Sequence, residues 1–268
     1  MSASVPTVLD RILAETRAEV ERRKREVPIE APSEQQSSGN GRFRAALSGE
    51  GIGVIAEFKR RSPSAGALHA RPELEAIVPA YERGGAAAVS ILTEGPNFSG
   101  SLEDLRAARA ACTLPLLRKD FIVDDYQLHE ARIAGADAVL LIVAALEFAA
   151  LQALHASALG LGLDVLVEVH DRAELDLALE LGAEIIGINN RDLRDFSVDI
   201  ERTERMMGEI PSEKLVVSES GIATSEQLMR LQDRGVQAVL VGESLMRAPD
   251  PAAALAKLTS FRHTGPDI

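Results

Sequence analysis

Four similar segments recur along the chain: GGAAAVSIL (84–92), GADAVLLIV (135–143), GAEIIGINN (182–190) and GVQAVLVGE (235–243). In each segment a glycine follows a helix-like stretch and leads within about three residues into a short apolar, β-branched run. Such a run is typical of a buried parallel strand that follows a helix. One strand-helix unit takes about 25 to 30 residues, so the intervals of 51, 47 and 53 residues should each contain one further strand.

Runs suited to these intervening strands occur at Val54–Phe58, Leu114–Leu117, Asp164–Val169 and Leu215–Ser218. Between the strands lie amphipathic stretches whose apolar residues recur at three- and four-residue intervals, as in helices. Eight alternating units over about 200 residues predict an α/β fold, the (β/α)8 TIM barrel. An open dinucleotide-binding sheet is disfavoured because no strand is followed by GxGxxG.

The first residues precede the barrel. Thr7 to Arg25 is predicted to be a helix, because Thr7 and Asp10 resemble a capping box and an apolar stripe follows. The stretch APSEQQSSGNG (31–41) is polar and typical of a loop or mobile connector. We therefore expect residues 1–48 to form a helical extension and connector that pack on the barrel, and residues 49–268 to form the catalytic barrel.

Composition excludes several classes of function. The chain has 268 residues, 46% hydrophobic and 26% charged, which indicates a folded globular protein. Its net charge of −12 and its 3% aromatic content disfavour nucleic-acid binding. An anionic ligand would therefore need a local cluster of positive groups.

The single cysteine, Cys112, cannot form an internal disulfide, which fits a reducing cytoplasm. The longest apolar run, Ala138 to Leu146, is too short to cross a membrane, and the start of the chain lacks a signal-peptide pattern. We expect a cytoplasmic protein without membrane association.

The polar residues at the ends of strands are the candidates for chemistry, since barrel enzymes act at the C-terminal ends of their strands. Side chains alternate along a strand, so Ile55, Glu57 and Lys59 share one face while Ala56 and Phe58 share the other. Phe58 suits the layer beneath the helices, which directs Glu57 and Lys59 into the barrel mouth. The alternative is that these two residues form only a structural ion pair.

Two further charges follow the same pattern. Lys119 ends the run LPLLRKDF, and Glu168 lies between two valines in VLVEVH. An ammonium and a carboxylate that face one cavity can serve as general acid and general base; the alternative is a salt bridge. Burial favours the neutral form of Glu168 and a nearby lysine favours the charged form, and the sequence leaves the winner open.

The remaining strand ends suggest binding groups. In GINNRD, Asn189 and Arg191 share a face and suit a substrate hydroxyl or anion, although turn formation also explains the asparagines. The turns in VSESGI and LVGESL predict a phosphate site at Ser220, Gly221, Gly242 and Glu243. For Glu243 only the backbone N–H would help, because its carboxylate repels phosphate.

No spacing of histidine, cysteine or carboxylate residues suggests a metal site, and the five histidines are scattered. His170 follows Glu168 on the same face but is interpreted as a bystander. These residues together predict a barrel enzyme that acts on a small phosphorylated compound by acid-base chemistry, without metal or cofactor.

Seven motifs carry a resemblance to a known family: IAEFKRRSPSAG, LLRKDFIVDDYQ, LIVAAL, LVEVHD, GINNRDL, VSESGI and LVGESLM. Together, and in this order, they resemble the indole-3-glycerol phosphate synthase family of tryptophan biosynthesis. The resemblance implies a (β/α)8 barrel with an N-terminal helical segment. It also implies ring closure, decarboxylation and dehydration of 1-(2-carboxyphenylamino)-1-deoxyribulose 5-phosphate to indole-3-glycerol phosphate, by a carboxy-lyase without cofactor.

The resemblance also implies roles for individual residues. Lys119 matches the general acid that protonates the ribulose carbonyl oxygen, and Glu168 matches the general base that assists loss of water. Lys59 matches a lysine that contacts the substrate's carboxylate or phosphate and serves as a candidate second acid. Glu57 and Asn189 match further members of the catalytic set.

Other matched positions bind the substrate. Arg191 matches an arginine that positions the catalytic groups, and Ser62 matches a position that orders the cover over the substrate. Phe98, Phe121 and Leu140 match the apolar lining around the aromatic ring, with plain core packing as the alternative. At the second phosphate turn the family often has serine, where this chain has Glu243, so a hydroxyl is lost.

Two other interpretations compete with this one. The phosphoribosylanthranilate isomerase family shares the phosphate anchor but has cysteine at the end of strand one, where this chain has Glu57 and Lys59. A catalytically silent metabolite-binding or scaffolding barrel is the second alternative. We expect a monomer or weak homo-oligomer, with other tryptophan-pathway enzymes as candidate partners.

Overall fold

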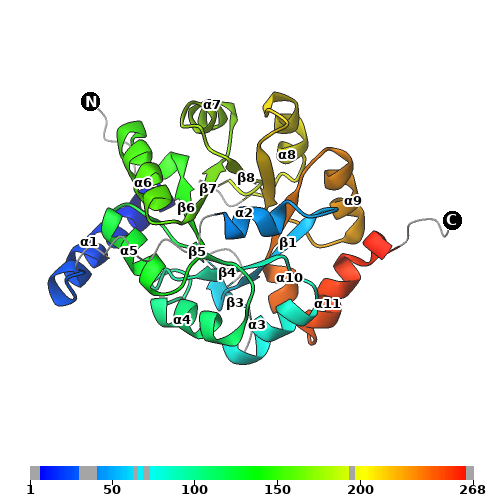
Figure 1. Cartoon of the computed structure of the whole chain (residues 1–268), viewed down its shortest axis with the longest axis horizontal. Helices are drawn as coiled ribbons and strands as arrows, with labels where there is room; N and C mark the ends of the chain where they lie inside the picture. Colours follow the sequence, from blue (N-terminus) through cyan, green and yellow to red (C-terminus); the bar gives the residue numbers. More distant parts are fainter. Residues whose placement is uncertain (1–6, 30–40, 63–65, 69–72, 193–196, 264–268) are drawn as a thin grey trace.

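Eight parallel strands close into a barrel in the order β1-β10-β9-β8-β7-β6-β5-β4. Helices surround this barrel as an outer ring (Figure 1). The prediction of a (β/α)8 barrel is confirmed. The computed structural model describes residues 7–29, 41–62, 66–68, 73–192 and 197–263.

All eight strands lie where the sequence predicted them. They are β1 (Gly53–Phe58), β4 (Ala88–Leu92), β5 (Leu116–Lys119), β6 (Ala138–Ile142), β7 (Asp164–Val169), β8 (Ile185–Asn189), β9 (Leu215–Glu219) and β10 (Ala238–Val241). Strand β5 begins two residues later than predicted, after Pro115, which has no N–H for a strand ladder. Strand β5 also ends two residues later than predicted, at Lys119.

The outer helices alternate with the strands. They are α3 (Leu74–Arg83), α4 (Leu102–Ala111), α5 (Asp125–Ile133), α6 (Phe148–Gly160), α7 (Arg172–Glu180), α8 (Glu201–Met206), α9 (Ser225–Asp233), α10 (Glu243–Met246) and α11 (Pro251–Leu258), with short 3-10 turns η2 (Val143–Ala145), η3 (Met207–Glu209) and η4 (Ser260–His263). Polar side chains cap several helix starts, as Asp171 does by accepting a hydrogen bond from the Glu174 N–H.

The repeated glycines end helices in the left-handed region. Gly135, Gly182 and Gly235 have φ of 91°, 81° and 85°. In the first repeat Gly84 is the helix C-cap and Gly85, with φ of 86°, takes the equivalent position. A side chain at these positions would be strained, so glycine allows each helix to turn into the next strand.

The barrel has an inner and an outer apolar layer. Ile55 packs inside the barrel with Leu117 and Leu166. Ala56 and Phe58 pack outside it, in the layer beneath the helices. The alternation predicted for β1 is therefore confirmed, and it directs Glu57 toward the barrel axis.

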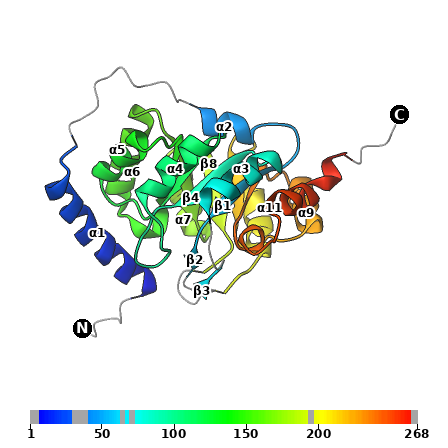
Figure 2. The ribbon, with the colours of Figure 1, turned by 90° about the horizontal axis from the view of Figure 1, so that it is seen from below.

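Helix α1 (Val8–Glu26) lies outside the ring (Figure 2). Thr7 caps it in a capping box with Asp10, as predicted. The Tyr126 hydroxyl of α5 donates to the Val27 carbonyl at 2.8 Å, and Lys24 pairs with Asp124 at 2.5 Å. These contacts fasten α1 to α5.

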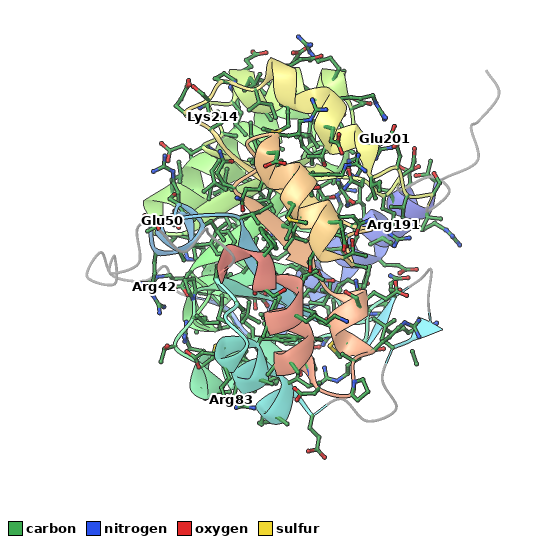
Figure 3. The ribbon with its side chains drawn as sticks, turned by 90° about the vertical axis from the view of Figure 1, so that its right-hand side faces the viewer. Arg42, Glu50, Arg83, Arg191, Glu201 and Lys214 are labelled. Atoms are coloured by element: carbon green, nitrogen blue, oxygen red, sulfur yellow. The ribbon has the colours of Figure 1, made fainter. Side chains whose placement is uncertain are left out.

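Helix α2 (Arg42–Leu47) covers the N-terminal end of the barrel. Its buried Phe43 and Leu47 join the interior apolar cluster. The hairpin of β2 (Arg61–Ser62) and β3 (Gly66–Ala67) lies at the opposite end (Figure 2). Figure 3 likewise shows Arg42 and Arg191 at opposite ends.

Helix α2 therefore leaves the C-terminal strand ends uncovered. The predicted polar connector, 31–41, lies outside the described residues except for Gly41, the N-cap of α2. Within the described part of the chain, no helix is long and apolar enough to cross a membrane.

Candidate active site

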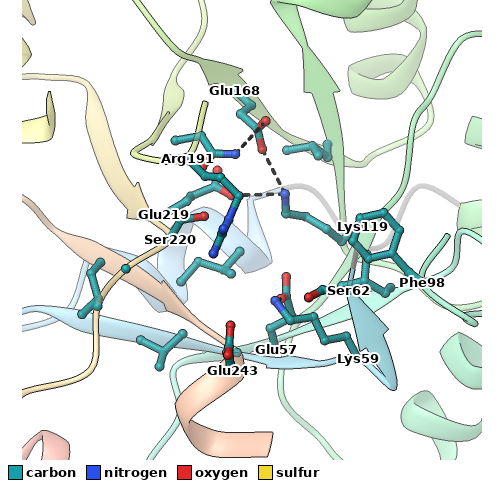
Figure 4. A pocket seen from close by; sticks show the side chains of 18 of the residues that line it. Glu57, Lys59, Ser62, Phe98, Lys119, Glu168, Arg191, Glu219, Ser220 and Glu243 are labelled. Atoms are coloured by element: carbon teal, nitrogen blue, oxygen red, sulfur yellow. Dashed lines mark hydrogen bonds and ion pairs between the residues drawn. The ribbon is translucent and has the colours of Figure 1, made fainter. Parts of the chain in front are cut away.

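A cavity of about 420 Å³ opens at the C-terminal ends of the strands. Figure 4 shows charged side chains from several strands converging on it. Every site residue predicted from the sequence lines this cavity, and the structure therefore brings all of them together: Glu57, Lys59, Ser62, Phe98, Lys119, Phe121, Leu140, Glu168, Asn189, Arg191, Ser220, Gly221, Gly242 and Glu243.

Lys119 occupies the centre of the cavity (Figure 4). Its Nζ lies 2.9 Å from Oε2 of Glu168 and 3.2 Å from Oε2 of Glu219. Burial lowers the pKa of Lys119, but Glu168, Glu219 and Glu57 together raise it above its ordinary value. Lys119 is therefore an ammonium.

Glu168 has positive or donor groups on both carboxylate oxygens. Lys119 binds Oε2, while the Asn189 Nδ2 donates to Oε1 at 3.2 Å and His170 Nε2 lies 3.4 Å from Oε1. Burial raises the pKa of Glu168, but Lys119 and His170 bring it below its ordinary value. Glu168 is therefore ionised, whereas the sequence left open whether its neutral or its charged form is favoured.

Glu219 is a pocket residue that the sequence analysis missed. It ends β9 and is 1% exposed, and its Oε1 has no hydrogen-bond partner among the residues that the structure describes. Burial, together with the nearby Glu168 charge, raises the pKa of Glu219 to about 7 despite Lys119. The two carboxylates on Lys119 therefore differ in protonation near neutral pH. The signal was present, because Glu219 shares the inward face of Val217.

Asn189 is held in one orientation. Its Oδ1 accepts from the Arg191 backbone N–H at 3.0 Å, so its Nδ2 faces Glu168. The neighbouring Asn190 is fully buried and its Nδ2 donates to the Ser220 carbonyl at 3.1 Å. Asn189 thus orients the Glu168 carboxylate and Asn190 holds the next strand-end turn, so the two asparagines do more than form a turn.

Glu57 and Lys59 form a direct pair, with Nζ 2.6 Å from Oε1. Both also line the cavity, so the predicted ion pair and the predicted placement in the barrel mouth hold together. Strand β1 pairs with β10, with Ile55 opposite Leu240. Lys59 therefore directly follows the strand that lies beside the turn containing Gly242.

The apolar side of the cavity contains two rings. The centroids of Phe98 and Phe121 lie 6.4 Å apart with planes inclined by 40°. Leu140 is 2% exposed and belongs to the interior cluster, yet it lines the cavity as well. Core packing and pocket lining are thus both true of Leu140. Ser62, in β2, is buried at the same cavity.

The last two strand ends form tight turns. Ser220 and Gly221 have φ of 68° and 82°, and a Cβ on Gly221 would lie 2.5 Å from Val198 Cγ1. Gly242 is the N-cap of α10. The Glu243 carboxylate is paired with Arg247 at 3.2 Å. Arg247 also lines the cavity and was missed by the sequence analysis, although it lies one helical turn after Glu243.

His170, interpreted from the sequence as a bystander, lies next to the site. It contacts Glu168 from behind the cavity, and its Nδ1 lies 3.0 Å from Oε2 of Glu174. Within the described residues, no group of three histidine, cysteine, aspartate or glutamate side chains is placed to hold a metal ion.

Known proteins are similar to this chain in sequence. The family model described as "Indole-3-glycerol phosphate synthase" matches residues 9–258. Proteins named indole-3-glycerol phosphate synthase from Polaromonas sp. and Variovorax paradoxus are 46% and 45% identical, covering 94% and 95% of this chain and 97% and 99% of their own length. The "Indole-3-glycerol phosphate synthase 2" of Streptomyces coelicolor is 52% identical over 80% of this chain and 83% of its own.

Solved structures support the fold. The chain is similar to 3-hexulose-6-phosphate synthase from Salmonella typhimurium, with a TM-score of 0.64 and 18% identity over 78% of this chain and 97% of the other. A mutant tryptophan synthase alpha-subunit from Pyrococcus furiosus gives a TM-score of 0.59 and 12% identity over 78% of this chain and 98% of that chain. The family model and the close relatives settle the family: this chain belongs to the indole-3-glycerol phosphate synthases.

Proposed function

We propose that Lys119 and Glu168 are the general acid and general base of the reaction of this family. That reaction converts 1-(2-carboxyphenylamino)-1-deoxyribulose 5-phosphate into indole-3-glycerol phosphate, carbon dioxide and water. The observation that carries the assignment is the position of Lys119 Nζ, 2.9 Å from Glu168 and 3.2 Å from Glu219 in the strand-end cavity. An ammonium held there is charged, fixed and screened from bulk water.

Ring closure needs a proton at the ketone oxygen, because the attacking aromatic carbon temporarily loses aromaticity. The Lys119 ammonium supplies that proton, and the surrounding carboxylates keep it protonated until the oxygen becomes basic. Loss of the carboxyl group as carbon dioxide then leaves a hydroxylated ring that must lose water.

Dehydration needs a base to remove a proton and an acid to convert the leaving hydroxyl to water. Glu168 is ionised and oriented by Asn189, so it suits the base. Lys59, paired with Glu57, suits the contact with the substrate's anionic groups and is the candidate second acid. Arg191 fixes Asn189 through its backbone N–H and lines the same cavity.

The substrate is an extended molecule whose two ends, the phosphate and the aromatic ring, must be held close together. We assign the phosphate to the turns at Ser220–Gly221 and Gly242–Glu243, where backbone N–H groups are available. We assign the aromatic ring to Phe98, Phe121 and Leu140, with Ser62 at the rim. Anchoring both ends brings the aromatic carbon toward the ketone, which reduces the entropy lost on reaching the transition state.

The phosphoribosylanthranilate isomerase alternative requires a cysteine at the end of strand one, and this chain has none there. The one cysteine, Cys112, is the buried C-cap of α4 and does not line the cavity. The end of β1 offers Glu57 and Lys59 instead. An activity assay distinguishes a catalytically silent binding barrel from an enzyme.

The assay measures indole fluorescence after adding the substrate to purified protein in buffer that contains a chelator and no cofactor. The chain has no tryptophan, so the background is low. A rising indole signal supports the function and its independence of metal. Binding without signal would favour the silent barrel. We also propose a cytoplasmic enzyme that is a monomer or weak homo-oligomer, in keeping with its buried, unpaired Cys112.

A further inference from the structure

His170 lies between two carboxylates. On the inner side its Nε2 is 3.4 Å from Oε1 of Glu168, which is 2% exposed. On the outer side its Nδ1 is 3.0 Å from Oε2 of Glu174, which is 18% exposed, and its backbone N–H donates to the same oxygen at 2.8 Å. The imidazole therefore bridges a buried carboxylate of the site and a more accessible carboxylate of α7.

The contacts of His170 define its protonation. A hydrogen bond to Glu174 requires a proton on Nδ1. A neutral ring would then point its Nε2 lone pair at the ionised Glu168, which is repulsive, so Nε2 must also carry a proton. Burial lowers the pKa of His170, but Glu174 and Glu168 raise it above the ordinary value. The Nε2 proton faces Glu168 and has no hydrogen-bond partner within the described part of the chain.

The two sides of this bridge face different spaces. Glu168 lines the catalytic cavity, whereas His170 and Glu174 line a separate hollow of about 560 Å³ between α1, α7 and α8. In that hollow Asp199 and Arg205 pair with each other. The other charged groups that face His170 or its hollow are Asp10 of α1, Asp171 and Arg172 of α7, Asp192, Arg202 of α8 and Glu219 of β9.

The reaction needs a proton from outside. Ring closure consumes one proton at the ketone oxygen, and dehydration consumes one at the leaving hydroxyl and returns one to the base. The substrate's carboxylate leaves as neutral carbon dioxide, so each turnover takes up one proton net. Lys119 and Glu168 can exchange the returned proton across 2.9 Å, whereas the net proton comes from outside the cavity.

We propose that His170 delivers this proton. The Nε2–H bond breaks as an O–H bond forms on Glu168 Oε1, and Glu168 passes the proton on to the neutral amine of Lys119. The ring is left neutral with its proton on Nδ1; it then turns toward the outer hollow, where its Nε2 takes up a proton from solvent beside Glu174 and the imidazolium is restored. The 3.4 Å separation shortens in the working complex, as catalytic hydrogen bonds often do. This inference rests on the proposed acid-base roles of Lys119 and Glu168.

The test compares His170→Gln with a matched control. Since a proton-transferring side chain typically contributes about 10²-fold or more, and solvent can partly replace a relay, we expect kcat to fall by about tenfold with KM unchanged. The fall should grow with rising pH, the solvent deuterium isotope effect on kcat should increase, and added imidazole should restore kcat. The control is His129→Gln, because His129 also pairs with a carboxylate, Asp125, at 3.1 Å but lines neither space.

Other outcomes separate the two proposals. An inactive wild-type protein would contradict the proposed function itself. An active wild type with His170→Gln at normal kcat across the pH range, with altered KM alone, or with a uniform loss that imidazole does not restore, would overturn the relay. If His170→Gln does not fold, Glu174→Gln is the second variant. It leaves His170 in place and should give the same pH-dependent loss of kcat, and a wild-type profile would overturn the relay.

Discussion

A Cβ atom on Gly187 would lie 2.3 Å from Oε1 of Glu219, so the glycine of β8 leaves the space that the carboxyl of β9 occupies. Gly187 is opposite Glu168 in the β7–β8 ladder and opposite Val217 in the β8–β9 ladder. One missing side chain in this ring of the barrel therefore lets two carboxylates approach the same lysine, Lys119.

The first prediction is that Gly187→Ala displaces Glu219 and lowers kcat by about 10- to 100-fold, because a misplacement of about 1 Å can cost this much. Steady-state kinetics measure the effect. Gly208→Ala is the control, since a Cβ on Gly208 has no atom within 4 Å. A normal kcat for Gly187→Ala would show that the Glu219 position is not needed.

The second prediction concerns pH and stability. Because the pKa of Glu219 rises from 4.5 to about 7 on folding, the folded state binds more protons than the unfolded state between these values. The free energy of unfolding should therefore fall as pH rises through this window. Glu219→Gln cannot titrate, so its fall should be smaller, as urea unfolding near pH 5 and near pH 8 would measure.

Glu168→Gln is the comparison for this experiment. The pKa of Glu168 is lowered in the fold, so its contribution is present above the ordinary pKa and is lost as pH falls below it. Its own titration therefore lies below the measured window, and because the Glu168 charge helps to raise the pKa of Glu219, Glu168→Gln should also make the fall between pH 5 and pH 8 smaller. An equal fall for wild type and Glu219→Gln would mean that Glu219 is ionised throughout the window.

The sequence predicted the barrel because its signals are local and repeated. Each helix-to-strand glycine, such as Gly135 or Gly182, marks a unit by itself, and alternation along a strand separates inward from outward residues. The same two rules found Lys119 and Glu168, because each is a charge at the end of an apolar run.

What the sequence could not supply depends on contacts between strands. Arg118 and Lys119 are adjacent charges in one motif, yet Arg118 is 0% exposed and bonds Asp120 at 2.8 Å and Glu130 at 3.3 Å outside the barrel interior. The proposed role of His170 depends on its contact with Glu174, one helical turn away. The direction of the Glu168 pKa shift required the distance to Lys119, which no local pattern contains.

The third prediction is that Lys119→Ala lowers kcat by about 10²-fold or more, the usual contribution of a general acid. The variant also leaves Glu168 and Glu219 without their shared cation, so stability should fall at neutral pH. Lys257→Ala, at an exposed position of α11, is the control. A kcat near that of the wild type would remove Lys119 from its assigned role. The loss of kcat in Lys59→Ala would measure the contribution of the candidate second acid.

The fourth prediction tests the phosphate end. Arg247 lies one turn after Glu243 on the cavity wall and pairs with it at 3.2 Å, which offsets the negative charge that this chain places beside the proposed phosphate turn. Both side chains are about half exposed, so solvent weakens the effect. Arg247→Met should therefore raise KM by only about three- to tenfold, with kcat unchanged.

Two comparisons separate charge from packing at this position. Arg247→Lys keeps the charge and should retain most of the affinity, whereas Glu243→Ser combined with Arg247→Met removes the repulsion that Arg247 offsets and should recover part of the lost KM. The KM values of the wild type and of Arg247→Met should differ at low salt and converge at high salt, because screening weakens the attraction of an exposed cation for phosphate. An unchanged KM in Arg247→Met at low salt would mean that backbone N–H groups at Gly242 and Gly221 hold the phosphate without help from this arginine.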